Sequence, residues 1–366
     1  MTPLTIRAEP LGPEPMPGEL SWPRLRRRLL ILGIVLVAVA AAVLLLPGLG
    51  SLRRRFSEAS PTWLFAAVVL EVLSCLSYVV AFRSVFCRRL SWRTSYEIGM
   101  AELATNSLIS VGGAGGLALG AWILRRGGMS TGHIARRTVS FFLLTSLANV
   151  TALIVAGIGL ATGVLHGSAS PWLSIAPAAL GVLAIGFVLL LRPLARLLAA
   201  RTGRARLAAA LESLAAGVDE ALVLLRTGEP LLILGLFGYM LFDVAVLGVC
   251  FAAFGNDVPP AGVLLLAYLI GQLGGLLPIP GGIGGVDGGL IGALILYGAN
   301  TVAAATAVLA YRGVVLLVPA VLGVPAMLVL QRRLRQETHD IMACAPGGEV
   351  EILGRGRVKA AELLRT

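Results

Sequence analysis

The sequence predicts an all-α integral membrane protein with about six spanning helices and two oppositely oriented re-entrant helical hairpins related as an inverted repeat. Three observations lead to this fold class. The 366 residues are 57% hydrophobic and only 13% charged, which is typical of membrane-spanning helices and not of a soluble domain. Two apolar segments of membrane length are interrupted by glycine clusters. The basic residues gather in the connections between apolar runs.

Residues 1–28 predict a disordered basic cytoplasmic tail, because they are rich in proline and end in Arg24-Leu-Arg-Arg-Arg28. The apolar run 29–46 is long enough to cross a bilayer, so we interpret it as an uncleaved transmembrane helix and not as a signal peptide. It opens a transmembrane domain that we expect over residues 29–331. The other full spans are predicted at 61–82, 138–165, 172–191, 230–254 and 300–330.

The two interrupted segments, about 96–124 and 261–297, are predicted to be the re-entrant hairpins. In the second, Pro278 and Pro280 remove backbone donors and end a helix. Glycines add backbone freedom that a helix has to suppress; they are Gly281, Gly282, Gly284 and Gly285. Irregular backbone survives at membrane depth only when it is buried in protein or lines a polar cavity. The alternative for this segment is a surface loop between two helices.

Residues 192–228 differ from the spans, because leucines at roughly helical spacing alternate with six arginines. This pattern predicts an amphipathic linker helix that lies along the cytoplasmic membrane surface. The last segment, 332–366, carries mixed charge and is expected to be a cytoplasmic tail.

The lysine and arginine count distinguishes re-entrant hairpins from two further spans. With hairpins, the cytoplasmic pieces contain 26 of the 30 Lys and Arg residues, which leaves Arg53–Arg55 outside and Arg312 within a span. If both segments crossed the membrane, the basic residues 125–137 and 192–226 would lie outside. The charges therefore favour hairpins, with both termini in the cytoplasm and the chain in the cytoplasmic membrane.

The two hairpins also resemble each other at an offset of 169 residues. Leu108, Gly112, Gly113, Gly115, Gly116 and Gly120 fall on Leu277, Gly281, Gly282, Gly284, Gly285 and Gly289. Chance similarity is the alternative, since the chain contains 45 glycines. A half-helix is expected to begin after each cluster, near Gly116 and near Val286. Its unpaired N–H groups and positive dipole end favour an anion, so two such ends predict an anion site at the membrane midplane.

Charged residues within apolar runs are the other candidates for the site. They are Glu71, Glu102, Asp243, Asp287 and Arg312. Each costs at least about 2.5–3.5 kcal/mol at the bilayer centre, so none is expected to face lipid. Arg312 cannot lose its charge and needs a carboxylate or an anionic ligand. Either Asp287 and Arg312 form a structural pair, or Arg312 meets a lipid phosphate while Asp287 orients the loop or exchanges partners.

The remaining polar candidates leave two interpretations open. Glu71 and Asp243 are either proton-coupling sites or groups satisfied by neighbouring hydroxyls. Asn106 is expected to hydrogen-bond across the first hairpin or to a headgroup. No catalytic, nucleotide-binding or metal-binding constellation emerges, so we expect neither an enzyme nor a cofactor. The net charge of +11 fits basic loops on anionic lipid, not nucleic-acid binding.

The segment 276–294, with Tyr297-Gly298 and Tyr311-Arg312-Gly313, resembles the lysylphosphatidylglycerol synthase transmembrane region, a flippase-like family of bacterial and archaeal membrane proteins. The run 106–124 with Arg125-Arg-Gly-Gly-Met-Ser130 is similar to that family's first signature. The resemblance covers most of residues 25–335. This chain has Asp287 where the family usually has Glu, and its first hairpin lacks the usual proline, acid and arginine.

The resemblance implies lipid translocation. In two-domain members this region moves an aminoacylated phospholipid, and a separate cytosolic domain, which we do not expect here, synthesises it. The implied substrate is an anionic phospholipid or a polyprenyl-phosphate-linked sugar. The alternatives are a non-transporting scaffold or regulator of a lipid- or glycan-modifying enzyme, and an intramembrane lipid-modifying enzyme that uses Asp243 and Glu71. A homodimer and a separate lipid-modifying enzyme are the protein partners considered.

Overall fold

The computed structural model describes residues 50–108, 114–126, 129–167, 170–202, 205–276, 284–333, 349–352 and 356–359, with single helical positions at 27, 30 and 34. The predicted span 29–46 therefore lies largely outside the described residues. So do the tips of both predicted hairpins, at 109–113 and 277–283.

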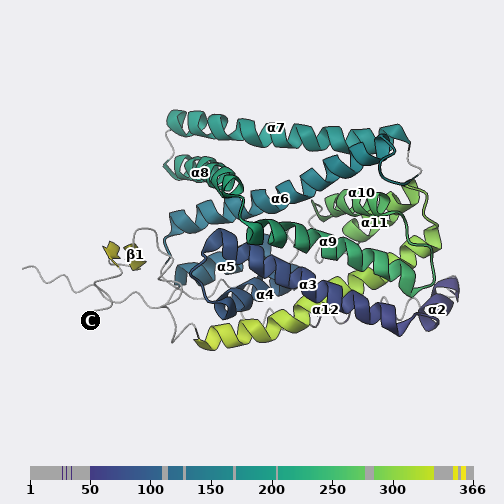
Figure 1. The fold of residues 1–366 in the computed structure, drawn as a ribbon. Helices are drawn as coiled ribbons and strands as arrows, with labels where there is room; N and C mark the ends of the chain where they lie inside the picture. The colour runs from purple at the N-terminus through teal and green to yellow at the C-terminus, as the bar shows by residue number, and fades with distance from the viewer. Residues whose placement is uncertain are drawn as a thin grey trace, which may run out of the picture.

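The described chain is a bundle of helices (Figure 1). Its helices are α2 (Gly50–Ser57), α3 (Pro61–Phe86), α4 (Trp92–Leu108), α5 (Ala114–Arg126), α6 (Thr131–Ala161), α7 (Pro171–Arg201), α8 (Ala205–Thr227), α9 (Pro230–Ala253), α10 (Ala261–Gln272), the short 3-10 helix η3 (Leu273–Leu276), α11 (Gly285–Leu296) and α12 (Thr301–Arg333). Two short strands, β1 (Glu349–Ile352) and β2 (Gly356–Lys359), pair antiparallel in the C-terminal tail. The sequence analysis did not predict these strands.

Five of the described helices, α3, α6, α7, α9 and α12, are long and apolar enough to cross a membrane. Their most apolar windows have a mean hydropathy of 2.1 to 2.5. The prediction of a helical, multi-pass membrane protein is confirmed. Proline stands at the first turn of α3, α7 and α9, where its missing N–H costs nothing because that donor has no helical partner.

The predicted linker 192–228 is divided in the structure. Its first ten residues continue α7 to Arg201, and most of the rest forms α8. The extension is stabilised by ion pairs, because Arg192 and Arg196 of α7 both contact the carboxylate of Asp219 on α8. A span can therefore continue past its apolar window without leaving its charges unpaired.

Contacts between helix ends define two ends of the bundle. At the first end, Arg137 donates to the carbonyl of Val85 at 2.6 Å, and Arg88 pairs with Glu229. At the second end, the N–H of Ser60 donates to the carbonyl of Ala253 at 2.8 Å. The first end lies at the left of Figure 1, beside α8, and the second lies at the right, beside α2.

The described arginines are distributed unevenly between these ends. Those at the first end are Arg83, Arg88, Arg89, Arg93, Arg125, Arg126, Arg136, Arg137, Arg192, Arg196, Arg201 and Arg226. Among the described side chains, the second end has only Arg54 and Arg55. The first end is therefore much the more basic of the two.

Two pairs of short helices lie inside this frame. Helices α4 and α5 form an antiparallel pair near the first end, and α10 and α11 form one near the second end (Figure 1). Both pairs pack closely through glycine. A Cβ at Gly120 would lie 1.6 Å from Oε1 of Glu102, and one at Gly274 would lie 2.1 Å from the carbonyl oxygen of Gly285. Only glycine fits such approaches without displacing its neighbour.

The order of elements in the first half recurs in the second. Helices α3, α4, α5 and α6 begin at Pro61, Trp92, Ala114 and Thr131, and α9, α10, α11 and α12 begin at Pro230, Ala261, Gly285 and Thr301. Each helix of the second set thus begins 169 to 171 residues after its counterpart. The agreement extends well beyond the glycine clusters that first indicated it.

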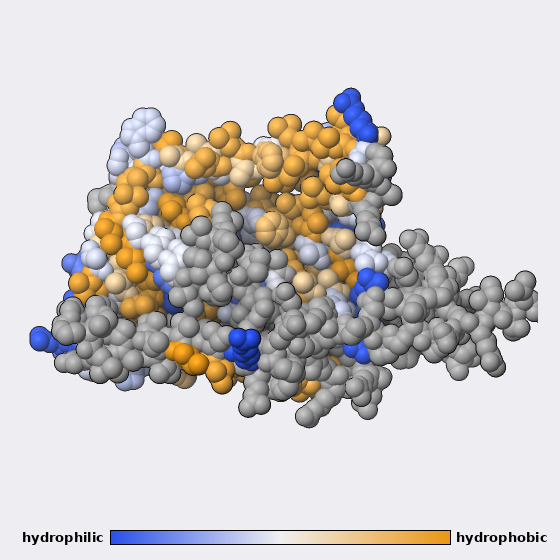
Figure 2. All heavy atoms as spheres, turned by 180° about the vertical axis from the view of Figure 1, so that it is seen from behind, coloured by the Kyte–Doolittle hydropathy of each residue, from blue (hydrophilic) through white to orange (hydrophobic). Residues whose placement is uncertain are grey.

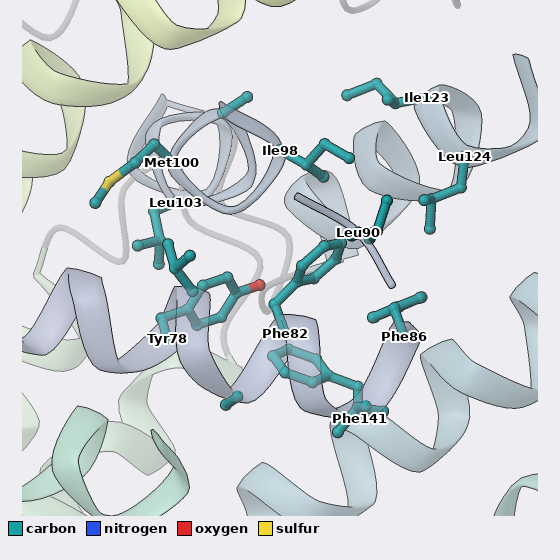
Figure 3. Packing of buried hydrophobic residues seen from close by; sticks show 14 of the residues in the cluster. Tyr78, Phe82, Phe86, Leu90, Ile98, Met100, Leu103, Ile123, Leu124 and Phe141 are labelled. Atoms are coloured by element: carbon teal, nitrogen blue, oxygen red, sulfur yellow. The ribbon is translucent and has the colours of Figure 1, made fainter. Parts of the chain in front are cut away.

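The buried core has two parts. The first joins α3, α4, α5 and α6, and the ring of Tyr78 meets that of Phe141 edge-on at 5.3 Å. Figure 3 shows aromatic side chains of α3 lying close to Ile98 and Leu103 of α4. The second part joins α9, α10, α11 and α12. The space left between these two parts contains most of the buried polar groups discussed below.

Candidate functional site

A cavity of about 550 Å³ lies among the spans and the inner ends of both short-helix pairs. Asn106 and Ser107 at the end of α4 contribute to its wall, as do Gln272 and Gly275 at the end of α10 and η3. The spans contribute the other polar lining groups, which are Glu71, Ser74, Ser146, Asn149, Tyr239, Asp243, Tyr311 and Arg312. The cavity is thus polar in the middle of an apolar bundle.

The carboxylate of Asp287 and the guanidinium of Arg312 are paired. Asp287 stands in the first turn of α11, and its Oδ1 lies 2.6 Å from Nε of Arg312 on α12. Only 14% of the Arg312 side chain and 18% of the Asp287 side chain are exposed. The two atoms do not have the geometry of a hydrogen bond, so the contact is chiefly an attraction between charges.

Asp287 also caps its own helix. Its Oδ2 accepts a hydrogen bond from the backbone N–H of Gly284 at 2.8 Å. Gly284 has a φ of 87°, a left-handed conformation that glycine adopts without strain. A carboxylate here is further stabilised by the positive end of the α11 dipole.

Asp243 of α9 lines the same cavity as Arg312. Its Oδ2 accepts hydrogen bonds from the hydroxyls of Tyr268 and Tyr311, the latter at 3.2 Å. Arg312 also acts electrostatically on this carboxylate. Arg312 therefore interacts with two carboxylates, that of Asp287, which it contacts, and that of Asp243, which its charge influences.

Glu71 of α3 is the least satisfied acid on the cavity wall. It is 4% exposed, and its Oε1 accepts only from the thiol of Cys75 at 3.6 Å. Its Oε2 is buried without a hydrogen-bond partner among the described residues. Glu71 and Asp243, which both line the cavity, interact electrostatically. The neighbouring hydroxyls thus satisfy one oxygen of Asp243 but neither oxygen of Glu71.

Glu102 lies apart from this group. It is 1% exposed, packs between α4 and α5 beside Gly120, and accepts a hydrogen bond from the hydroxyl of Tyr78 at 2.8 Å. It does not line the cavity. The structure thus brings together four of the five predicted charged residues and leaves Glu102 in the packing of the first helix pair.

The predicted helix N-termini carry side-chain acceptors. Oδ1 of Asn106 accepts the N–H of Gly116 in the first turn of α5 at 2.8 Å, as Asp287 accepts that of Gly284. Gly115 also lies in the first turn of α5, and Gly285 begins α11. Gly113, Gly281 and Gly282 lie outside the described residues. Two of the N–H groups expected to meet an anion are therefore already bonded to the protein.

Tyr268 is the residue of the site to which the sequence gave no role. For Tyr239 and Tyr311 the sequence favoured packing positions with a satisfied hydroxyl. In the structure Tyr311 and Tyr268 bond Asp243, and Tyr239 lines the cavity. One signal was available, because Tyr311 stands directly before an arginine within a span. Nothing comparable marks Tyr268, which meets Asp243 from a different helix.

Comparison with known protein families identifies the family to which the chain belongs. No curated protein sequence matches the chain. The family described as "Lysylphosphatidylglycerol synthase TM region" matches residues 30–323, which include every residue that lines the cavity. That range is most of the 366 residues and relates the protein to lipid handling in membranes. The chain is a member of the lysylphosphatidylglycerol synthase TM-region family.

Proposed function

We propose that the protein translocates an anionic phospholipid or a lipid-linked sugar phosphate across the cytoplasmic membrane. The observation that supports this function best is the position of Arg312 on the wall of a polar cavity between two broken helix pairs. A guanidinium at membrane depth needs an anionic partner. A headgroup phosphate matches its donors and forms strong charge-assisted hydrogen bonds with it.

The contacts of Asp287 support an exchange of partners. When a phosphate binds Arg312, the carboxylate gives up its ion pair but keeps the N–H of Gly284 and the favourable dipole of α11. The carboxylate of Asp287 is thus still stabilised after a phosphate has taken its place beside Arg312. Arg312 would alternate between Asp287 in the empty site and the phosphate in the loaded site.

We infer further that the α4/α5 and α10/α11 pairs are re-entrant hairpins that enter from opposite sides of the membrane. The recurring helix starts support an inverted repeat, the architecture that places a transporter's substrate site near the midplane. The basic first end supports a cytoplasmic location for that end and for both termini. Rocking of one half against the other would then expose the cavity to each side in turn.

Reconstitution of the purified full-length protein tests the proposal. Translocation of a fluorescent phosphatidylglycerol is measured in proteoliposomes for the wild type, Arg312→Ala and Arg312→Lys. We expect Arg312→Ala to abolish translocation, and Arg312→Lys to restore only part of it because an ammonium cannot bind phosphate through two parallel donors. Arg93→Ala, which removes an exposed, ion-paired arginine outside both cavities of the bundle, should behave as the wild type.

Two outcomes would contradict the proposal. A wild-type rate in Arg312→Ala would show that the arginine does not carry the headgroup. No translocation by the correctly folded wild-type protein would instead favour a non-transporting scaffold or regulator of a lipid- or glycan-modifying enzyme.

A further inference from the structure

A second cavity, of about 210 Å³, lies between α6, α7 and α8. Among the described residues, Ser146 contributes the single polar side chain to its wall. The other lining residues are Leu143, Leu144, Leu147, Val150, Ala184, Ile185, Val188, Leu189, Val218, Ala221, Leu222 and Leu225. This apolar cavity is distinct in character from the polar cavity that contains Arg312.

The apolar cavity arises because α6 and α7 diverge. The two helices approach closely at Gly157, where a Cβ would lie 2.9 Å from that of Ala178. At the other end α8 is wedged between them, held to α6 by a hydrogen bond from Ser140 to the carbonyl of Gly217 at 2.8 Å and to α7 by the Arg192–Asp219 pair. Figure 1 shows this divergence, and Figure 2 shows a hollow below the apolar band of α7.

The two cavities meet on α6. Ser146 and Val150 line both of them. These residues are four positions apart on a helix and so lie on the same face, one turn from each other. The polar cavity and the apolar cavity therefore adjoin each other at this turn of α6.

We propose that the apolar cavity binds an acyl chain of the transported lipid while its phosphate meets Arg312. This inference rests on the proposed function only for the position of the lipid phosphate at Arg312. An engineered apolar cavity of about 150 Å³ stays dry and binds benzene, so a larger one with this lining suits hydrocarbon better than water. A free phosphate or sugar has no group that would occupy it. Helix α7, which forms one wall, exposes Leu183, Phe187 and Leu190 on its surface, so acyl chains of the bilayer would border the site.

The test compares two ligands that share a headgroup. Binding of dioleoyl-phosphatidylglycerol and of glycerophosphoglycerol, the same headgroup without chains, is measured on the purified full-length protein. Val188→Phe fills the apolar cavity, whereas Val182→Phe adds the same ring to an exposed position of α7 that lines neither cavity. Ala184→Phe fills the cavity from a second position, and size-exclusion chromatography checks that each variant is folded.

We expect the wild type to bind the dioleoyl lipid more tightly than the headgroup alone. Val188→Phe and Ala184→Phe should weaken lipid binding by about tenfold, equivalent to about 1.4 kcal/mol, and leave glycerophosphoglycerol binding unchanged. Val182→Phe should change neither. Unchanged lipid affinity in both cavity-filling variants overturns the proposal, as does a wild type that binds the headgroup as tightly as the lipid.

Binding to Arg312→Ala distinguishes a failure of the acyl-chain proposal from a failure of the proposed phosphate site. If the phosphate site is correct, this variant weakens the binding of both ligands. If Arg312→Ala binds both as the wild type does while Val188→Phe loses only the lipid, the phosphate assignment fails and the acyl-chain site stands. If Arg312→Ala weakens both and the cavity-filling variants change nothing, the acyl-chain site alone fails.

Discussion

One oxygen of Asp287 lies 2.6 Å from Nε of Arg312, and its other oxygen accepts the N–H of Gly284. The carboxylate thus joins the start of α11 to the middle of α12. Asp287 and Arg312 differ in the interactions that each would keep if the other were removed. Asp287 keeps a hydrogen bond and a helix dipole if Arg312 is removed, whereas removal of Asp287 takes from Arg312 the carboxylate that it contacts.

Asp287→Ala should therefore destabilise the protein more than Arg312→Ala. Breaking a buried ion pair from one side costs about 3–5 kcal/mol, and loss of the capping acceptor adds about 1 kcal/mol. The double variant Asp287→Ala/Arg312→Ala should be more stable than Asp287→Ala, because it does not leave a largely buried arginine without the carboxylate that it contacts. Thermal unfolding in one detergent measures all three.

Arg192→Ala is the control for that series. Its side chain is 43% exposed, so its ion pair with Asp219 should contribute no more than about 1 kcal/mol. If the effects of the two single substitutions at 287 and 312 simply add in the double variant, the residues are not coupled in the way the structure indicates.

Asn106→Ala should loosen the start of α5. It leaves the N–H of Gly116 without the acceptor that it meets at 2.8 Å, and a buried unsatisfied donor costs about 1–3 kcal/mol. Asn106→Asp keeps an oxygen at that place and adds a charge that the helix dipole favours. Hydrogen exchange of residues 114–120 should thus increase in Asn106→Ala and stay near the wild-type rate in Asn106→Asp. Equal exchange in both variants would refute a capping role.

Gly274→Ala should force η3, which follows α10 directly, away from the start of α11. The added methyl group would lie 2.1 Å from the carbonyl oxygen of Gly285, and such overpacking typically costs about 1–3 kcal/mol. Gly292→Ala in the same helix pair is the matched control, because nothing lies within 4 Å of its Cβ position. Thermal unfolding should show a loss for the first variant and no loss for the second. A Gly274→Ala protein as stable as the wild type would contradict the close packing.

Hydropathy and helical periodicity in the sequence were sufficient to predict where the membrane-spanning helices lie. Length and apolar composition located the five described spans, since each must cover the thickness of a bilayer. Helix ends were less predictable. The α7 extension to Arg201 depends on Asp219, which comes from another helix, and no local pattern reports such a partner.

The sequence identified those residues of the candidate site whose charge is unfavourable inside a membrane. It did not identify the residues that join the site only through contacts between separate helices. An arginine and four acids within apolar runs are conspicuous because a charged side chain inside a membrane raises the free energy of the protein. Their partners were not, since Tyr268 meets Asp243 and Tyr78 meets Glu102 only through the packing of separate helices. The same limit explains why Glu102 was grouped with the cavity residues although it lies between α4 and α5.

Cysteine labelling tests the opposite orientation of the two helix pairs. In a cysteine-free background, Arg89→Cys and Arg126→Cys flank α4 and α5, and Asp257→Cys and Ala299→Cys flank α10 and α11. If both pairs are re-entrant, a membrane-impermeant maleimide should label the first two only from the cytoplasmic side and the last two only from outside. Members of one pair labelled from opposite sides would mean that this pair spans the membrane.

Glu71→Gln should uncouple translocation from a pH gradient. Glu71 is buried on the cavity wall, and among the described residues the one hydrogen bond given to its carboxylate comes from the weak thiol donor of Cys75, so it has room for a proton that arrives through the cavity. Glutamine keeps the shape but cannot take up or release that proton. Asp243→Asn should slow translocation yet preserve the response to the gradient, because Tyr268 and Tyr311 already bond this carboxylate.

The matched control for this prediction is Glu102→Gln, which alters an equally buried acid outside the cavity and should leave the response to the gradient intact. Translocation in proteoliposomes is measured with an imposed pH gradient and again after a protonophore collapses it. A wild-type response in Glu71→Gln would exclude Glu71 as the coupling acid. A wild-type protein that ignores the gradient would exclude proton coupling altogether and leave Glu71 as a polar contact for the headgroup.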